Sequence, residues 1–298
     1  MFYISKWHLL TVPIATGTIN AVMPTQAVAD RKRRTSPRWH RALVTGASSG
    51  IGEAFARRLA AEGCDLVVVA RRGDRLERLA GELRSTHGVK VDTSVADLAD
   101  PQQLKQVEQW LVGEGSAPVD LLVNNAGGHR HIANFWELDR ESLCAEAAVN
   151  AFAVLRLTHA AAAEMAKRGR GNIVNISAGV AFYPAPGSAT YAASKAFVTS
   201  LGEAVNHELR GTGVHLTTVC PGYTRTESPT RLGFHEGNVP RALWIDPEDL
   251  VERALRAAST GASVYTPGLF NRFGAQIGHH LPRWIVLRWV ARFFNPNR

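Results

Sequence analysis

Thr45-Gly-Ala-Ser-Ser-Gly-Ile-Gly52 says more about the architecture of this chain than any other segment. A short apolar run ends at Thr45, and an amphipathic run begins near Gly52. Glycines 46, 50 and 52 allow the tight turn and the close backbone approach that a pyrophosphate needs at a helix N-terminus. Glycine-rich turns are common, but one between a first strand and a first helix is a much stronger signal. The segment therefore predicts a dinucleotide-binding turn.

Short apolar segments alternate with longer amphipathic segments from residue 41 to about residue 268. The expected strands are Ala42–Thr45, Asp65–Ala70, Lys90–Val95, Leu121–Asn124, Asn172–Ser177 and Val214–Val219. The expected helices are Gly52–Ala61, Asp74–Leu83, Pro101–Leu111, Glu141–Lys167 and Ala193–Leu209, with a last helix and strand within Asp246–Thr266. This order predicts a single α/β domain with a doubly wound parallel sheet, whose ligands bind at the carboxyl ends of the strands.

The net charge of +8 is concentrated at the two ends of the chain. Residues 1–40 and 269–298 carry 11 of the 34 Lys and Arg residues but only one acid, so the middle is nearly neutral. A domain of this charge lacks the basic face that nucleic-acid binding requires. Cys64, Cys144 and Cys220 show no metal-ligand spacing, so we expect no metal site and three small buried thiols in a reducing compartment.

Both ends are expected to lie outside the α/β domain. Residues 1–40 are expected to be a disordered extension, because the stretch Leu9–Met23 is too weakly hydrophobic for a secretory signal. We therefore expect a cytoplasmic protein that is not secreted. Residues 269–298 are expected to form a basic, aromatic, helical tail. Its arginines Arg288 and Arg292 share one helix face, and the tail either lies on an anionic membrane surface or packs over a pocket or dimer interface.

Tyr191 and Lys195 stand four residues apart in the segment Thr190-Tyr-Ala-Ala-Ser-Lys-Ala196. Side chains at this spacing share one face of a helix. A tyrosine hydroxyl normally has a pKa near ~10, and a neighbouring ammonium favours the phenolate and lowers that pKa. A proton-transfer pair downstream of a dinucleotide-binding turn indicates hydride transfer coupled to proton transfer.

The chain resembles the short-chain dehydrogenases/reductases over residues 41–268. The resemblance rests on Thr45–Gly52, Asn124-Asn-Ala-Gly127, Asn150, the Tyr191–Lys195 pair and Pro221-Gly-Tyr-Thr-Arg-Thr226, all in the family's order. It implies a Rossmann-type fold and an oxidoreductase, homo-oligomeric, that transfers a hydride between NAD(P)(H) and a carbonyl or alcohol. Tyr191 would donate the proton, Lys195 would bind the nicotinamide ribose, and Asn150 would hold a water that relays protons to Lys195.

The second strand is followed by Arg71 and Arg72, where NAD-binding proteins place an acid. A guanidinium pairs well with a ribose phosphate, so NADP(H) is expected rather than NAD(H). The alternative is that both arginines are surface residues at a helix start, as Arg75 and Arg78 are expected to be. By resemblance, cofactor contacts also come from Gly46, Ser48, Ser49, Gly50, Ile51, Gly52, Asp97, Leu98, Asn124, Ala126, Gly127, Tyr191, Lys195, Pro221, Gly222, Thr224 and Thr226.

One position departs from the family pattern. The family places a serine thirteen residues before the tyrosine, but this chain has Ala178 there, with Ser177 one position earlier. Adjacent side chains on a strand point to opposite faces, so Ser177 needs a local bulge to replace the missing serine. Ser188, Thr190 or a backbone amide is a second source of the donor, and a weakened site is the third explanation. We expect a working enzyme in which Ser177 substitutes.

The segment after Gly127 contains His129 and His131, which we expect to be solvent-facing loop residues at the substrate mouth rather than metal ligands. The aromatic tail favours a hydrophobic or lipid-like substrate. A cofactor-binding sensor or scaffold, with its chemistry weakened at Ala178, is the alternative function.

Overall fold

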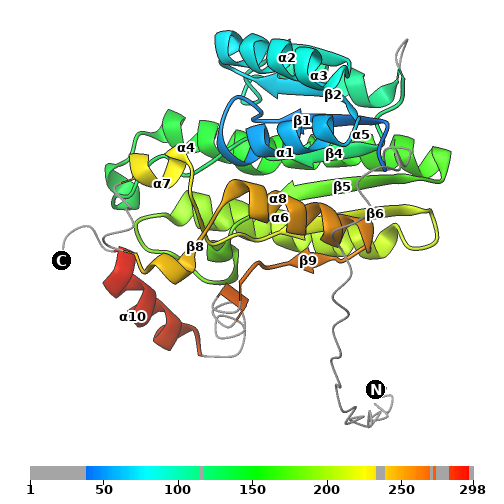
Figure 1. Cartoon of the computed structure of the whole chain (residues 1–298). Helices are drawn as coiled ribbons and strands as arrows, with labels where there is room; N and C mark the ends of the chain where they lie inside the picture. The colour runs from blue at the N-terminus through cyan, green and yellow to red at the C-terminus, as the bar shows by residue number, and fades with distance from the viewer. Residues whose placement is uncertain (1–37, 114–116, 233–238, 269–270, 273–281, 295–298) are drawn as a thin grey trace, which may run out of the picture. The chain divides into compact units, whose positions relative to one another are not determined.

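The computed structural model describes residues 38–113, 117–232, 239–268, 271–272 and 282–294. Its centre is a parallel sheet of seven strands in the order β3-β2-β1-β4-β5-β6-β9 (Figure 1). The strands are β1 Arg41–Thr45, β2 Asp65–Ala70, β3 Val91–Val95, β4 Leu121–Asn124, β5 Gly171–Ile176, β6 Val214–Val219 and β9 Val264–Tyr265, and β7 Tyr223–Thr224 pairs with β8 Trp244–Ile245 in a separate sheet. The chain order reverses between β1 and β4, so the expected doubly wound fold is confirmed.

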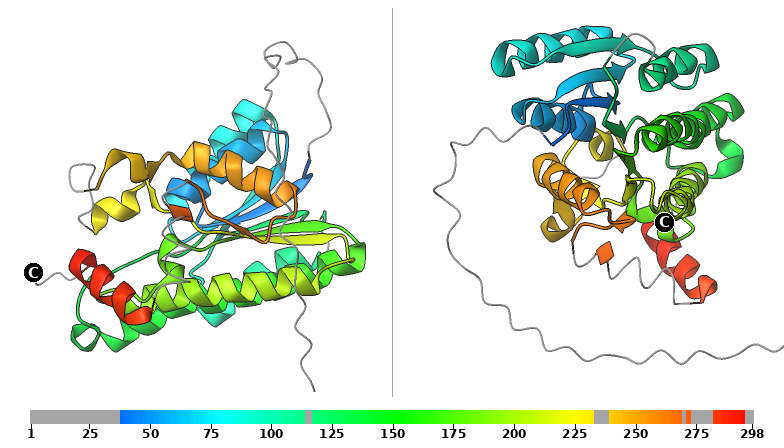
Figure 2. Two further views of the ribbon diagram at one scale, coloured as in Figure 1. Left: turned by 90° about the horizontal axis from the view of Figure 1, so that it is seen from below. Right: turned by 90° about the vertical axis from the view of Figure 1, so that its right-hand side faces the viewer.

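Helices cover both faces of this sheet (Figure 2). They are α1 Gly50–Ala61, α2 Gly73–His87, α3 Pro101–Val112, α4 Arg140–Ala147, α5 Ala153–Arg168, α6 Ala189–Glu208, α7 Glu227–Arg231, α8 Pro247–Ser259 and α10 Arg283–Phe294. The helix expected over Glu141–Lys167 is interrupted by a π-helical turn, Ala148–Phe152. Such turns are frequent at functional sites, and this one carries Asn150.

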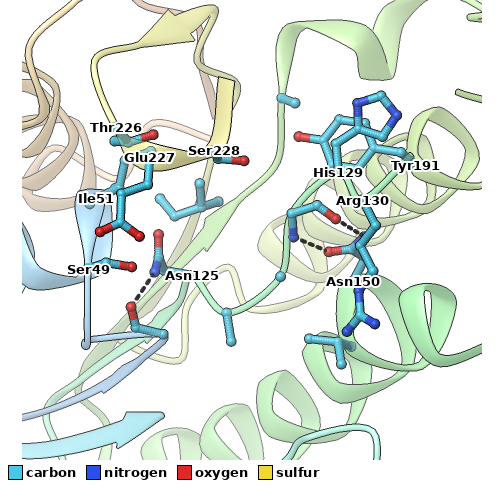
Figure 3. A pocket seen from close by; sticks show the side chains of 18 of the residues that line it. Ser49, Ile51, Asn125, His129, Arg130, Asn150, Tyr191, Thr226, Glu227 and Ser228 are labelled. Carbon is cyan, nitrogen blue, oxygen red and sulfur yellow. Dashed lines mark hydrogen bonds between the residues drawn. The ribbon is translucent and has the colours of Figure 1, made fainter. Parts of the chain in front are cut away.

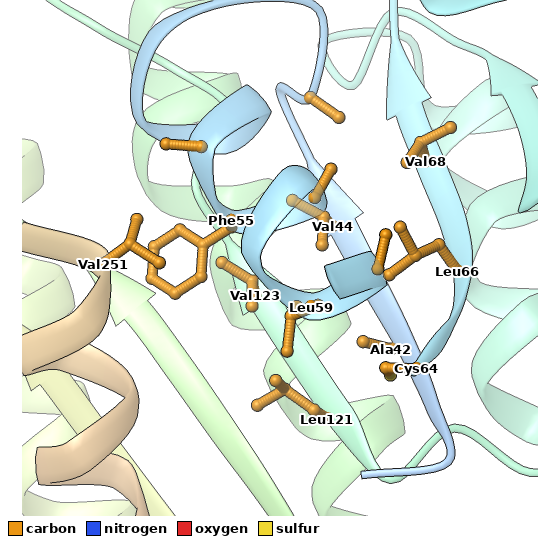
Figure 4. Close-up of a cluster of buried hydrophobic side chains, with 14 of the residues drawn as sticks. Ala42, Val44, Phe55, Leu59, Cys64, Leu66, Val68, Leu121, Val123 and Val251 are labelled. Carbon is orange, nitrogen blue, oxygen red and sulfur yellow. The ribbon is translucent and has the colours of Figure 1, made fainter. Parts of the chain in front are cut away.

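The strands are apolar on both faces because helices cover both. Leu43, Val67 and Leu122 pack into the cluster that includes α3 and α5. Their neighbours Val44 and Val68 belong to the other cluster, with α1, α2 and α8. Figure 4 shows this second cluster, in which the fully buried Phe55 of α1 lies against Val251 of α8. Burial of one such aromatic side chain stabilises the fold by roughly 1.5–3 kcal/mol.

Trp39 and His40, the last two residues of the expected N-terminal extension, contact the α/β domain. Trp39 is buried and its Nε1 donates to Asn172 Oδ1 at 2.9 Å, and His40 N donates to Asp120 Oδ2, so these residues are part of the packed domain. Residues 1–37 of the expected extension lie outside the described residues.

Cys64 and Cys220 are buried as expected, whereas Cys144 is exposed.

Helix α10 packs against the first turn of α6 and against the segment just before it. Val286 and Val290 are buried against Ala185 and Ala192, while Trp284 is 63% exposed. The described part of the tail therefore packs on the domain, and its expected place at a membrane surface, a pocket or a dimer interface stays a prediction. Among the described residues, no helix has both the length and the apolar character needed to cross a membrane.

Candidate active site

A cavity of about 650 Å³ lies at the carboxyl ends of β1, β2, β4, β5 and β6. Figure 3 shows Ser49, Ile51 and Asn125 on one side of it and His129, Asn150 and Tyr191 on the other. One cavity therefore contains both the turn Thr45–Gly52, called the glycine turn below, and the Tyr191–Lys195 pair. Of the expected cofactor contacts, the cavity is lined by Gly46, Ser48, Ser49, Gly50, Ile51, Arg71, Arg72, Asp97, Leu98, Ala126, Gly127, Tyr191, Lys195, Pro221, Gly222, Thr224 and Thr226.

The glycine turn has the backbone that the sequence requires. Gly46 and Gly50 have φ values of 68° and 59°, which residues with a side chain rarely adopt. A Cβ on Gly46 would lie 2.8 Å from Asn125 Nδ2 and 2.9 Å from Ala126 Cα. Gly52 does not line the cavity; it is buried and lets α1 approach the carbonyl of Gly46. The N-terminus of α1 opens into the cavity, and its unpaired amides fit a phosphate there.

Two arginines stand beside this turn. Arg72 Nη2 donates to Ser49 Oγ at 2.7 Å, and its Nε donates to Ser48 Oγ at 3.3 Å. Arg71 Nη1 lies 3.7 Å from Asp97 Oδ2. Both side chains line the cavity, and Arg72 is at the same time the N-cap residue of α2. Two guanidinium groups therefore stand in the cavity wall beside the glycine turn.

Glu227, at the start of α7, extends this charged group. Its carboxylate lies 2.9 Å from Arg75 Nη1 and 3.5 Å from Arg72 Nη1. The hydrogen bond from Arg75, followed by the charges of both arginines, holds the pKa of Glu227 below its usual value. Glu227 was absent from the expected site, because no motif in the sequence joins α7 to the arginines.

Asn124, an expected cofactor contact, does not line the cavity. It is buried at the end of β4, where its Nδ2 donates to Asn175 Oδ1 at 2.9 Å and to Thr158 Oγ1 at 3.1 Å. Its neighbour Asn125 points to the other side, lines the cavity and donates to Thr45 O at 3.0 Å. The alternation of side chains along the strand explains this exchange.

Asn150 is fixed by the loop after β4. Gly128 N donates to Asn150 Oδ1 at 2.9 Å, and Asn150 Nδ2 donates to Gly128 O at 3.0 Å. Gly127, with φ of 131°, leaves no room for a side chain beside Asn150. The amide keeps one N–H and one lone pair for a further partner. The structure therefore places Asn150 in the cavity wall but does not test the relay through water.

Tyr191 and Lys195 both line the cavity from α6, which begins at Ala189. Lys195 Nζ donates to Ile176 O at 2.8 Å and lies 5.8 Å from the centre of the Tyr191 ring. Burial lowers the pKa of Lys195 to about 8. Burial, followed by the charge of Glu146, raises the pKa of Tyr191 above its ordinary range. The expected lowering of the tyrosine pKa by Lys195 is therefore not present in this arrangement, because desolvation is the larger effect.

Ser177 lines the cavity as expected, but without the local bulge that would turn its hydroxyl into the cavity, and its role stays a prediction. Ser177 N donates to Val219 O and Gly179 N donates to Pro221 O, so the parallel ladder continues without a bulge. The backbone of Ala178 is extended, and the side-chain directions alternate normally. The Ser177 hydroxyl is buried and donates to Lys195 O at 2.9 Å, with Thr199 Oγ1 at 2.8 Å. Ala178 also lines the cavity, and its methyl group offers no hydrogen bond there.

Two side chains beside Tyr191 were not expected there. The ring of His129 stacks on that of Tyr191, with centroids 4.8 Å apart and an angle of 15° between the planes. Burial lowers the pKa of His129 to about 4, against a weaker hydrogen bond with the backbone of His131. Glu146 is buried in the cavity wall one helical turn before Asn150, and burial raises its pKa. The four-residue spacing from Asn150 was a signal for Glu146 in the sequence.

Comparisons with known proteins agree with this geometry. The family model for short chain dehydrogenase matches residues 40–235. A very-long-chain 3-oxoacyl-CoA reductase of Phaeosphaeria nodorum is 35% identical over 263 residues, which cover 86% of this chain and 73% of that protein. An inactive hydroxysteroid dehydrogenase-like protein 1 of Homo sapiens is 27% identical over 260 residues, or 87% and 76% of the two chains.

A solved structure gives the same result. The short-chain dehydrogenase from Sphingobium yanoikuyae in complex with NADPH is similar with a TM-score of 0.71 and 35% identity. The match covers 87% of this chain and 96% of that chain. The family model and these identities together show that the chain belongs to the short-chain dehydrogenase/reductase family.

Proposed function

We propose that the protein is an NADP(H)-dependent oxidoreductase that interconverts a carbonyl and an alcohol. One observation carries the proposal: a single cavity holds the glycine turn, both arginines and the Tyr191–Lys195 pair. A structural ion pair or a surface tyrosine has no need of such a cavity. The supporting comparison is the NADPH complex of the Sphingobium yanoikuyae relative.

The residues of the site divide the reaction between them. NADP(H), when bound, supplies or accepts the hydride. The Tyr191 hydroxyl gives its proton to the carbonyl oxygen of the substrate, and its raised pKa keeps it protonated before that step. Lys195 has a pKa of about 8 and two N–H groups beyond its bond to Ile176 O, so it can hold a ribose hydroxyl as a cation near neutral pH.

The preference for NADP(H) rests on Arg71 and Arg72. Titration of the protein with NADPH and with NADH, followed by protein fluorescence, measures it directly. We expect the lower Kd for NADPH. Equal or tighter binding of NADH would overturn the assignment of these arginines.

The substrate class that we propose is a hydrophobic or lipid-like ketone. Helix α10 packs against Ala185 and against Ala192 of α6, so an apolar tail lies next to the helix that carries Tyr191 and Lys195. A relative of this chain is a very-long-chain 3-oxoacyl-CoA reductase. Turnover of NADPH with ketones of increasing chain length tests the class, and kcat/KM should rise with length.

A flotation assay with liposomes, with and without residues 269–298, tests a membrane role of the tail.

A cofactor-binding sensor is the second candidate. It is favoured by Ala178 and by the relative that is named an inactive hydroxysteroid dehydrogenase-like protein. A protein that binds NADPH but reduces no carbonyl would support it. Tyr191 and Lys195 in one cavity favour the enzyme, since a sensor has no use for a proton donor. The expected homo-oligomer and the expected boundaries at residues 40 and 268 stay predictions.

A further inference from the structure

The wall of the cavity beside Tyr191 lacks the hydroxyl that the family pattern leads one to expect. Ala178 presents a methyl group, and the Ser177 hydroxyl is bound to Lys195 O and Thr199 Oγ1. Of the other candidates for a donor, Ser188 and Thr190 do not line the cavity, and a backbone amide stays the third. The oxygen of a bound carbonyl therefore needs a hydrogen-bond partner from another part of the wall.

His129 has a nitrogen for this purpose. Its Nε2 is buried and has no hydrogen-bond partner in the part of the chain that the structure describes. A buried polar atom without a partner is costly in an isolated protein, and such an atom in a cavity wall points to a ligand. The His129 ring stacks on the ring of Tyr191, so it lies beside the tyrosine that donates the proton (Figure 3).

The ring is held in place before any substrate binds. Gly128, the residue before it, exchanges two hydrogen bonds with the side chain of Asn150. On the other side, Ala133 N donates to Gly187 O at 3.1 Å, which ties the loop to the segment before α6. A donor that is fixed in advance is effective in catalysis because it needs no reorganisation during the reaction.

The neutral form of the ring suits this position. With a pKa of about 4, His129 stays uncharged at the pH at which NADPH is stable, so it does not repel Lys195. A neutral imidazole has one N–H and one lone pair. The hydrogen bond to the backbone of His131 uses this one N–H, so Nε2 donates to a carbonyl oxygen in the tautomer that gives up that bond. When Nδ1 carries the proton, Nε2 accepts from an alcohol hydroxyl.

We propose that His129 is a catalytic residue that binds the reacting oxygen of the substrate through Nε2, in place of the serine that is missing at Ala178. The hydride goes from NADPH to the carbonyl carbon and the proton goes from Tyr191 to the oxygen. His129 donates a hydrogen bond to that oxygen and transfers no proton. This proposal rests on the proposed function.

The test compares kcat in His129→Phe, which keeps a stacking ring but removes both nitrogens, with kcat in the control His159→Phe. His159 is exposed on α5 and does not line the cavity. We expect kcat to fall by about 10²–10³-fold in His129→Phe, with the Kd for NADPH unchanged. His159→Phe should keep kcat within about twofold.

The second arm restores the serine. Ala178→Ser in the His129→Phe background should recover about tenfold or more of the lost kcat, whereas Ala178→Ser alone should add little, because a donor is already present. His129→Gln, which keeps a polar group, should retain more activity than His129→Phe.

Two outcomes separate the proposals. Full turnover in His129→Phe, or an equal gain from Ala178→Ser in both backgrounds, overturns the role of His129 and leaves the oxidoreductase intact. A wild-type protein that binds NADPH but reduces no ketone overturns the proposed function, and the role of His129 with it. Binding of NADPH and the Tm of each variant show whether a loss of kcat reflects misfolding.

Discussion

The cofactor side and the substrate side of the cavity are built in different ways. On the cofactor side, the glycine turn and the N-terminus of α1 present backbone amides, and the glycines fix their positions. On the substrate side, His129, Glu146, Ala178 and Tyr191 present side chains whose direction depends on register and loop shape. Backbone sites follow from local sequence, because few residue types fit. Side-chain sites vary with each substitution, so the chemistry of this protein is decided on the second side.

The largest expected effect tests the substrate side. Tyr191→Phe removes the proton donor and should lower kcat by about 10²–10⁴-fold. Binding of NADPH should remain, because the ring and its stack with His129 are kept. Steady-state kinetics and fluorescence titration give both numbers. Intact turnover in this variant would show that another group donates the proton.

The next effect tests the cofactor side. Arg71→Ala combined with Arg72→Ala removes both cations beside the glycine turn, and the Kd for NADPH should rise about 10–100-fold. The Kd for NADH should hardly change, since that cofactor has no ribose phosphate. Arg78→Ala is the matched control, because Arg78 is exposed and pairs only loosely with Asp74. A similar loss for both cofactors would mean that the arginines support the fold and not the phosphate.

A third experiment tests how far the turn depends on backbone shape. Gly46→Ala puts a side chain at φ of 68° and against Ala126 Cα, so the free energy of unfolding should fall by about 1–3 kcal/mol. Gly81→Ala is the control, because Gly81 is exposed in α2 and has open space around it. It should stabilise the protein by about 0.5–1 kcal/mol. Urea unfolding measures both, and equal stability of the two variants would contradict the strain argument.

The smallest effect concerns Glu146. Burial raises its pKa, so the folded state binds this proton more tightly than the unfolded chain does. The charged carboxylate therefore lowers stability above its pKa, and this penalty disappears as the pH falls. Glu146→Gln should raise Tm by about 1–4 °C at pH 8 and by little near pH 4. Glu141→Gln, at an exposed position in the same helix, is the control. A shift that does not depend on pH would rule out the titration of Glu146 as its cause.

Much of the fold follows from the sequence because its strands are nearly continuous apolar runs between turn residues. The six expected strands differ from the observed ones by one residue or less at each end. Side-chain direction is harder to predict. Asn124 was expected in the cavity, yet its neighbour Asn125 lines it instead. Ser177 does line the cavity, but its hydroxyl is bonded within the fold, to Lys195 O and Thr199 Oγ1. A shift of one residue reverses the face, and only the position of the strand in the sheet fixes it.

His129 could not be placed from the sequence for another reason. A loop histidine is usually exposed, and nothing near it in the sequence predicts that its ring reaches Tyr191, 62 positions later. The contact depends on the π-helical turn that places Asn150 against Gly128. The position of His129 is therefore set by tertiary contacts between two distant segments of the chain, which the local sequence does not reveal.

The buried Lys195 also limits which substitutions this domain can accept during evolution. Its ammonium has lost most of its hydration, which the hydrogen bond to Ile176 O and the Tyr191 ring at 5.8 Å replace in part, so the folded chain would be more stable with an apolar residue there. Residues that weaken a fold are retained where activity requires them, at the cost of a trade-off between stability and activity. The core around β1, β2 and β4 supplies the reserve of stability that makes such a lysine tolerable. An apolar substitution of Lys195 should therefore stabilise the fold and abolish activity.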